Sequence, residues 1–317
     1  MYSLMIYFYM SLIFFMLMMI MMLMSVAFLT LFERKILGYI QDRKGPNKLS
    51  IIGLLQPFSD VIKLLNKEFY LIEKINTYYY LFMPMLILIL SMFIWVIIPF
   101  YINLYSLKFG MMLMLSIMCL GVYPLMLMGW ASNSNYSMLG AIRAIAQSVS
   151  YEVSLFLMLF SLILLIEGFS LDLFFLYQLN LYFCIFLFPL YLMFLVSMLI
   201  ELNRTPFDLV EGESELVSGF NTEYYSGEFA LIFMAEYLSI IFMSNLITLV
   251  FFGVYFFTFK FILIYMFHVF FVIWIRGVLP RIRYDNLMFM CWKKFLSLSL
   301  IYLMFIFGAK ELFMMLS

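Results

Sequence analysis

The chain has 317 residues and no net charge at neutral pH; 67% of its residues are hydrophobic and 11% are charged. Soluble domains are about half apolar and about a quarter charged, so this composition excludes a soluble globular protein and also an intrinsically disordered chain. Because the net charge is zero, no long-range field attracts an anionic partner, and we expect no nucleic-acid binding.

Eight apolar segments are long enough to cross a membrane as helices. An α-helix rises about 1.5 Å per residue, so about 20 apolar residues span the hydrocarbon core of a bilayer. The first segment is too long for the core of a signal peptide and has no basic leader, so we interpret it as a retained helix. The sequence thus predicts an all-α polytopic membrane protein that forms a single domain over residues 1–317, with spans at about 3–32, 77–100, 109–130, 143–167, 180–200, 228–251, 254–275 and 295–316.

The basic residues predict how these spans are oriented. Eight spans place both termini on one side of the membrane, and most lysines and arginines fall in the odd-numbered loops on the other side. The exceptions are Lys108, Lys260 and Lys310. Positive charge collects in loops that face the cytoplasm or its mitochondrial equivalent, the matrix, so we expect the odd-numbered loops to face inward.

The first inner loop contains a predicted amphipathic helix at about 51–69. Apolar side chains recur there at a spacing of three and four residues, while polar side chains occupy the other face. This pattern is typical of a helix that lies in the membrane interface, although a helix that only covers the end of the bundle would show it too. The charged segment before it, residues 33–48, is predicted to be rich in turns, because Gly45 and Pro46 break helices.

The loop between the fifth and sixth spans, residues 201–227, is unusually acidic. Arg204 is its one basic residue, whereas a loop on the inner side normally collects positive charge. Carboxylates at this density raise one another's pKa and can share protons. Two other interpretations stay open, a solvated acidic surface and a docking site for a basic partner. The candidate residues for proton sharing are Glu201, Asp208, Glu211, Glu213 and Glu215.

Two acidic residues lie inside predicted spans. Glu152 follows Arg143 by nine residues and Glu236 follows Glu228 by eight; at about 1.5 Å per residue, both lie near the middle of the bilayer. A charged residue there costs about 2.5–3.5 kcal/mol and by default marks an ion or proton pathway. The alternative for Glu152 is a structural ion pair with Arg143 or Arg204.

Cysteine and histidine are too few and too scattered to hold a metal. Cys119, Cys184 and Cys291 form no closely spaced pair, and His268 is the one histidine. A structural zinc site or an iron–sulfur cluster takes four such ligands, so we expect any redox cofactor to sit on another chain. His268 itself fits a buried side chain that is hydrogen-bonded to a neighbouring helix.

Intramembrane carboxylates, an interfacial helix and an acidic inner loop together suit proton movement, or an amphipathic substrate that enters from the bilayer. A series of motifs narrows this choice: residues 33–35 (ERK), 41–47 (QDRKGPN), 56–60 (QPFSD), 129–135 (GWASNSN), 150–153 (SYEV), 201–221 (ELNRTPFDLVEGESELVSGFN), 234–237 (MAEY), 280–285 (PRIRYD) and 292–295 (WKKF). From about residue 25 to 300, in this order and spacing, the chain closely resembles the chain 1 family of the proton-pumping NADH:ubiquinone oxidoreductase, respiratory complex I.

The resemblance implies a core membrane subunit of eight helices at the heel of the membrane arm. Such a subunit forms the membrane-side part of the ubiquinone-binding tunnel and the start of the proton path that links quinone reduction to pumping. Residues carried over to the quinone site are Glu33, Arg34, Arg43, Phe58 and Asp60. Those carried over to the proton path are Glu152, Glu201, Asp208, Glu211, Glu213, Glu215 and Glu236, with Arg143 and Arg204 as charge partners.

The resemblance also implies partners and a location. Ubiquinone is the substrate, and the flavin and the iron–sulfur clusters sit on other subunits. The neighbours are the peripheral-arm subunit that carries the terminal iron–sulfur cluster, the subunit that lies beside it at the quinone site, and membrane lipids. The location is the mitochondrial inner membrane, with the charged loops in the matrix and both termini on the intermembrane side. An excess of methionine, 30 residues, fits a genetic code with a second methionine codon, as animal mitochondria use.

Two alternatives to this assignment remain. A stand-alone secondary transporter or proton channel could use the same buried acids, although the two halves of the chain show no evident repeat. The homologous membrane subunit of an energy-converting hydrogenase is the other alternative, against which the quinone-side motifs argue.

Overall fold

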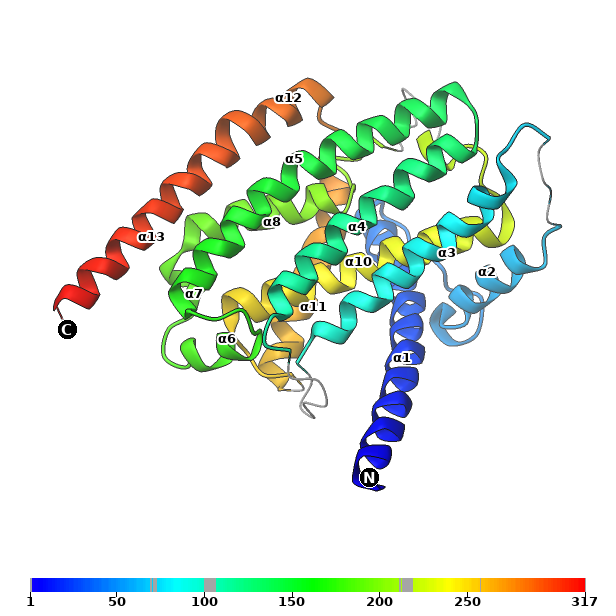
Figure 1. The fold of residues 1–317 in the computed structure, drawn as a ribbon. Helices are drawn as coiled ribbons and strands as arrows, with labels where there is room; N and C mark the ends of the chain where they lie inside the picture. Colours follow the sequence, from blue (N-terminus) through cyan, green and yellow to red (C-terminus); the bar gives the residue numbers. More distant parts are fainter. Residues whose placement is uncertain are drawn as a thin grey trace.

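A computed structural model describes residues 2–68, 70, 73–99, 107–210, 212, 219–256 and 258–316, and within these ranges the chain forms helices and no strand (Figure 1). Seven of the described helices, some together with the short elements beside them, are long and apolar enough to cross a membrane. The predicted fold class, an all-α polytopic membrane protein, is confirmed. The long helices are α1 (Tyr2–Ile40), α3 (Thr77–Phe93), α4 (Gly110–Ala131), α5 (Asn135–Ile166), α10 (Ser226–Phe252), α11 (Phe259–Val278) and α13 (Leu296–Leu316).

Shorter elements connect the long helices. The region of the predicted fifth span holds α7 (Phe183–Phe186) and the apolar 14-residue helix α8 (Phe188–Glu201). The remaining short elements are η1 (Ile51–Gly53), α2 (Gln56–Leu65), η2 (Ile94–Ile97), α6 (Asp172–Tyr177), η3 (Gly219–Asn221), α12 (Tyr284–Phe289) and one π-helical stretch, η4 (Met290–Phe295).

The amphipathic helix of the first loop is shorter than the predicted range of 51–69. Regular α-helix begins at Gln56, with Pro57 in its first turn, and ends at Leu65. Gly53 stands just before it with a φ of +81°, and a Cβ atom there would lie 2.5 Å from the carbonyl oxygen of Pro46. Only glycine fits such a conformation so close to another backbone, so the chain turns before the helix starts.

Two helices extend further than the hydrophobic pattern predicts. α1 continues to Ile40 and carries Glu33 within it, although residues 33–48 were expected to form turns. α5 begins at Asn135, eight residues before the predicted start of that span. Glu33 of α1 is paired with arginines of other elements, and Ser137 of α5 donates to the Gly129 carbonyl of α4. Hydropathy does not register such contacts.

The core lies around α5 and α10, which bury larger shares of their length than α1 and α13 do. α5 packs against α4, α8 and α13, while α3 packs against α4 and α10. Figure 1 shows the amino-terminal half of α1 pointing away from the bundle and α13 along its opposite edge. The continuous stretch of η4 and α13 is held to α5 near each of its own two ends. Near its start, Cys291 donates a hydrogen bond to the Ser150 carbonyl, and near its end, Lys310 donates one to the Leu164 carbonyl.

Candidate functional site

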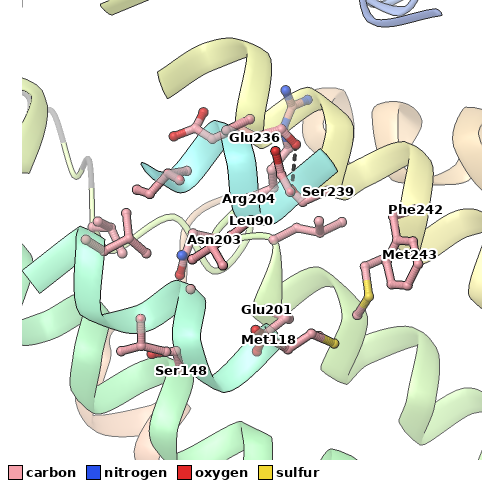
Figure 2. A pocket seen from close by; sticks show the side chains of 18 of the residues that line it. Leu90, Met118, Ser148, Glu201, Asn203, Arg204, Glu236, Ser239, Phe242 and Met243 are labelled. Atoms are coloured by element: carbon pink, nitrogen blue, oxygen red, sulfur yellow. Dashed lines mark hydrogen bonds between the residues drawn. The ribbon is translucent and has the colours of Figure 1, made fainter. Parts of the chain in front are cut away.

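A cavity of about 190 Å³ lies where α3, α4, α5 and α10 meet the turn that follows α8 (Figure 2). One wall is apolar and is formed by side chains of α3 and α4, among them Leu90 and Met118. The other side is charged. Its ionisable side chains are Glu201, Arg204, Asp208, Glu236 and Arg276, which come from α8, the following turn, α10 and α11.

The turn after α8 is held by the side chain of Gln147 on α5. The Gln147 amide nitrogen donates to the carbonyls of Ile200, at 2.9 Å, and Phe207, at 3.1 Å. These two carbonyls bracket residues 201–206, so one fully buried amide fixes both ends of the turn. The buried carboxylate of Asp208 extends this support, because Arg281 donates to it at 3.0 Å from the loop after α11.

Glu33 on α1, one of the residues predicted for the quinone site, reaches this cavity. Its carboxylate is 3% exposed and forms ion pairs with Arg204, at 2.9 Å, and with Arg276. The guanidinium of Arg204 also lies over the ring of Tyr237, 4.8 Å from its centroid. Burial by itself would lower the pKa of Arg204, but the facing Glu33 carboxylate and the Tyr237 phenol hold that pKa above its usual value. The cavity wall therefore keeps a buried, permanently positive group whose main counter-ion comes from α1.

The other residues predicted for the quinone site lie between α1 and α2 or on the surface. Asp60 accepts hydrogen bonds from Arg34 and, at 2.9 Å, from Gln56. Phe58 packs edge-on against Phe28 of α1, with 6.2 Å between ring centroids. These contacts fasten the amphipathic helix to α1. Arg43 lies exposed in the turn after α1.

Glu152 lies in a neighbouring space rather than in the charged cavity. A second cavity of about 250 Å³ is lined by Glu152, Cys119 and five apolar residues of α4 and α5. Met118 lines both cavities, so this one side chain stands between the space that holds Glu201 and the space that holds Glu152. Arg143 is half-buried on α5, nine residues before Glu152.

The structure thus brings together four predicted residues, Glu201, Arg204, Asp208 and Glu236, and links Glu33 to them. Three predicted acids, Glu211, Glu213 and Glu215, lie outside the described residues. Sequence reasoning counted Arg276 and Arg281 only toward membrane orientation and missed their pairing with Glu33 and Asp208. The sequence offered one indication of these basic partners: the acidic loop 201–227 is predicted to lie on the side of the membrane where positive charge normally collects.

Among the described residues, no group of three or more histidine, cysteine, aspartate or glutamate side chains could hold a metal ion. His268 instead forms a buried hydrogen bond with Tyr191 of α8.

Comparison with known proteins gives a consistent result. A sequence model described as NADH dehydrogenase matches residues 13–307. The NADH-ubiquinone oxidoreductase chain 1 of Apis mellifera ligustica is 54% identical over 287 residues, which cover 90% of this chain and 93% of the relative. The protein of the same name from Anopheles gambiae is 55% identical over 291 residues, covering 91% and 92%. That of Papio hamadryas is 45% identical over 287 residues, covering 88% and 90%.

Proposed function

Because the chain belongs to the NADH dehydrogenase family, among the chain 1 subunits of NADH-ubiquinone oxidoreductase, we propose that it forms the membrane-side wall of the ubiquinone tunnel and the start of the proton path. The observation that carries this proposal is the position of Glu33. Its carboxylate belongs to the helix that also carries Arg34, yet it is paired with Arg204 and Arg276 on the wall of the charged cavity.

The proposed tunnel wall consists of Glu33, Arg34, Arg43, Phe58 and Asp60. The ubiquinone head group is polar and its tail is apolar, so it needs an entry that is open to lipid and ends at charged groups. α2 fits this entry because it is fastened to α1 through Asp60 and keeps large apolar side chains such as Ile62 and Leu65 exposed.

The proposed proton path begins at the charged cavity. Reduction of ubiquinone to ubiquinol takes up two electrons and two protons. When neighbouring protein groups supply the two protons, each group that loses a proton becomes more negative by one charge, which changes the charge beside Glu33 and Arg34. The paired Arg204 passes this change to the cavity, where Glu201, Asp208 and Glu236 respond by exchanging protons. Glu152, behind Met118, continues the path, and Glu211, Glu213 and Glu215 complete the acidic loop.

The proposal includes the surroundings of the chain. The subunit sits in the mitochondrial inner membrane with its charged loops in the matrix. It contacts the subunit that carries the terminal iron–sulfur cluster and that subunit's quinone-site neighbour, while flavin and iron–sulfur clusters remain on partner chains. The eight predicted spans, with the fifth at α7 and α8, place both termini on the intermembrane side.

Two measurements test this proposal. Membranes are extracted in mild detergent and separated under native conditions, and the band that contains the chain is assayed for NADH:quinone reductase activity sensitive to quinone-site inhibitors. A photoreactive ubiquinone analogue is then cross-linked to that band and the labelled peptides are mapped. We expect a large active complex with labels in 33–60. A chain that migrates alone without activity, or labels confined to other subunits, would contradict the proposal and favour a stand-alone transporter.

A further inference from the structure

Three buried side-chain oxygens, at the end of α8 and in the turn that follows it, line the charged cavity without a hydrogen-bond partner among the described residues. These oxygens are Glu201 Oε2, Asn203 Oδ1 and Thr205 Oγ1. An unpaired buried polar atom is costly, and native proteins normally satisfy such atoms with protein groups or ordered water. Three of them so close together therefore point to a function for the space they face.

The hydroxyl of Thr205 differs from the other hydroxyls around the cavity. Ser91, Ser148 and Ser239 also line it, but each of them donates to a carbonyl oxygen of its own helix, at 2.8, 3.0 and 2.6 Å. Thr205 makes no such bond. Among the lining hydroxyls described by the structure, Thr205 is the one whose hydrogen and lone pairs remain available to a guest in the cavity.

Asn203 lies beside it, directly after the C-cap of α8. Its φ is +49°, in the left-handed region that ends many helices and that asparagine tolerates better than most residues other than glycine. The backbone around it is fixed from both ends by Gln147, so Asn203 cannot relax out of this position easily. Its Oδ1 can only accept hydrogen bonds, and therefore requires a donor.

Water is the guest that fits these groups. The cavity volume of about 190 Å³ exceeds what one water needs, about 10–15 Å³ by the same kind of measure. A water molecule donates two hydrogen bonds and accepts two, so it can satisfy an amide oxygen, a hydroxyl and a carboxylate together. In the view of Figure 2, Asn203 lies between Glu201 and Glu236.

We propose that Asn203 and Thr205 are positioning residues, which hold water in the cavity so that Glu201 and Glu236 exchange protons through it. Each transfer breaks an O–H bond on the donor and forms one on the acceptor, and no electrons move. This inference rests on the proposed proton path and deepens it. It assigns the task of ordering the water to two uncharged side chains.

The test uses variants of the assembled enzyme. Thr205→Val keeps the shape but removes the hydroxyl, and Asn203→Gly removes the amide while glycine accepts the positive φ. We expect each variant to assemble normally and to pump about three- to tenfold more slowly, with a larger solvent isotope effect, because proton transfer through disordered water becomes slower. Thr205→Ser should restore the parent rate. Thr248→Val is the matched control, because the Thr248 hydroxyl is buried but already donates to the Asn245 carbonyl.

Parent pumping rates and isotope effects in both Thr205→Val and Asn203→Gly would overturn the inference. Glu201→Gln, measured alongside, separates this failure from a failure of the proposed function. If Glu201→Gln loses pumping while the other two do not, the path stands and the positioning role falls. If Glu201→Gln also pumps fully, the proposed path itself is wrong. Should Thr205→Val fail to assemble, Asn203→Gly carries the test, and a parent pumping rate and isotope effect in that variant would overturn the inference.

Discussion

Tyr191 on α8 and His268 on α11 are joined by a buried hydrogen bond of 3.0 Å between the phenol oxygen and Nε2. Nδ1 of the same imidazole lies 2.8 Å from the Ile264 carbonyl oxygen, which can only accept. We therefore assign the proton of the neutral ring to Nδ1, so that Nε2 accepts from the tyrosine hydroxyl. The expectation of a histidine bonded to a neighbouring helix is confirmed.

Replacing Tyr191 by phenylalanine should weaken the fold slightly without affecting catalysis. The change leaves Nε2 of His268 without its donor and costs about 1 kcal/mol of unfolding free energy, the usual value of one such bond. Thermal inactivation of the purified complex measures the loss, and NADH:quinone reductase activity should equal that of the parent. A large fall in activity at unchanged thermal stability would show that the pair has a role in the reaction.

The ion pairs of Glu33 should matter far more than the pair of Asp60. Glu33→Gln leaves the buried guanidinium of Arg204 without its counter-ion, and breaking a buried pair in this way costs about 3–5 kcal/mol. We expect little assembled complex on native gels, and a raised ubiquinone KM in what does assemble. Asp60→Asn is the control, because its partner Arg34 is about half exposed; such pairs contribute about 0–1 kcal/mol. Equal losses in the two variants would contradict this ranking.

Glu236→Gln should separate assembly from proton pumping. The side chain lines the cavity, and glutamine has the same size and shape as glutamate, so the amide should be tolerated structurally. A positioned proton-transfer group typically contributes about a hundredfold or more to the rate, and we expect a fall of that order in coupled activity. Proton pumping and NADH oxidation are measured together in sealed vesicles. The control is Glu167→Gln at the exposed end of α5. Full pumping by an assembled Glu236→Gln enzyme would exclude Glu236 from the path.

Gly129→Ala should disrupt the crossing of α4 and α5. A Cβ atom at Gly129 would lie 2.3 Å from the Cβ of Ala141 and 2.9 Å from the Ser137 carbonyl oxygen, so the two helices would have to separate. Overpacking of this kind typically costs about 1–3 kcal/mol. Gly308→Ala on α13 is the matched control, because nothing lies within 4 Å of its added atom. The yield of assembled complex should fall only for Gly129→Ala.

The sequence was sufficient to predict the class of fold because the apolar segments are long and nearly free of charge. It was less reliable at helix ends. Glu33 and Arg34 follow the first apolar segment and suggested a loop, yet Glu33 continues α1 because two arginines from distant parts of the chain neutralise it. Hydropathy describes each residue alone, so it cannot register a partner about 170 or 240 positions away.

Because sequence patterns describe residues without their distant partners, only some of the site residues could be identified from the sequence. Acids inside apolar segments, such as Glu152 and Glu236, are conspicuous because a charge there is costly. Gln147 and Thr205 carry no charge, so neither side chain was singled out before the fold was known, although Thr205 lies within the motif 201–221. Their importance comes from geometry, since Gln147 reaches both ends of one turn and the Thr205 hydroxyl is left unbonded inside the cavity.

The fastening of α13 to α5 has a consequence for how the chain is made. The principal contacts of α13 are with α5 and with η4, which directly precedes it, and the other long helices pack mainly among themselves. During synthesis, the helices from α3 to α10 can therefore pack before α13 has left the ribosome. Docking of α13 is then a late step of membrane insertion, and it is completed when Lys310 reaches Glu167 and the Leu164 carbonyl. By that time the other helices already enclose the charged cavity.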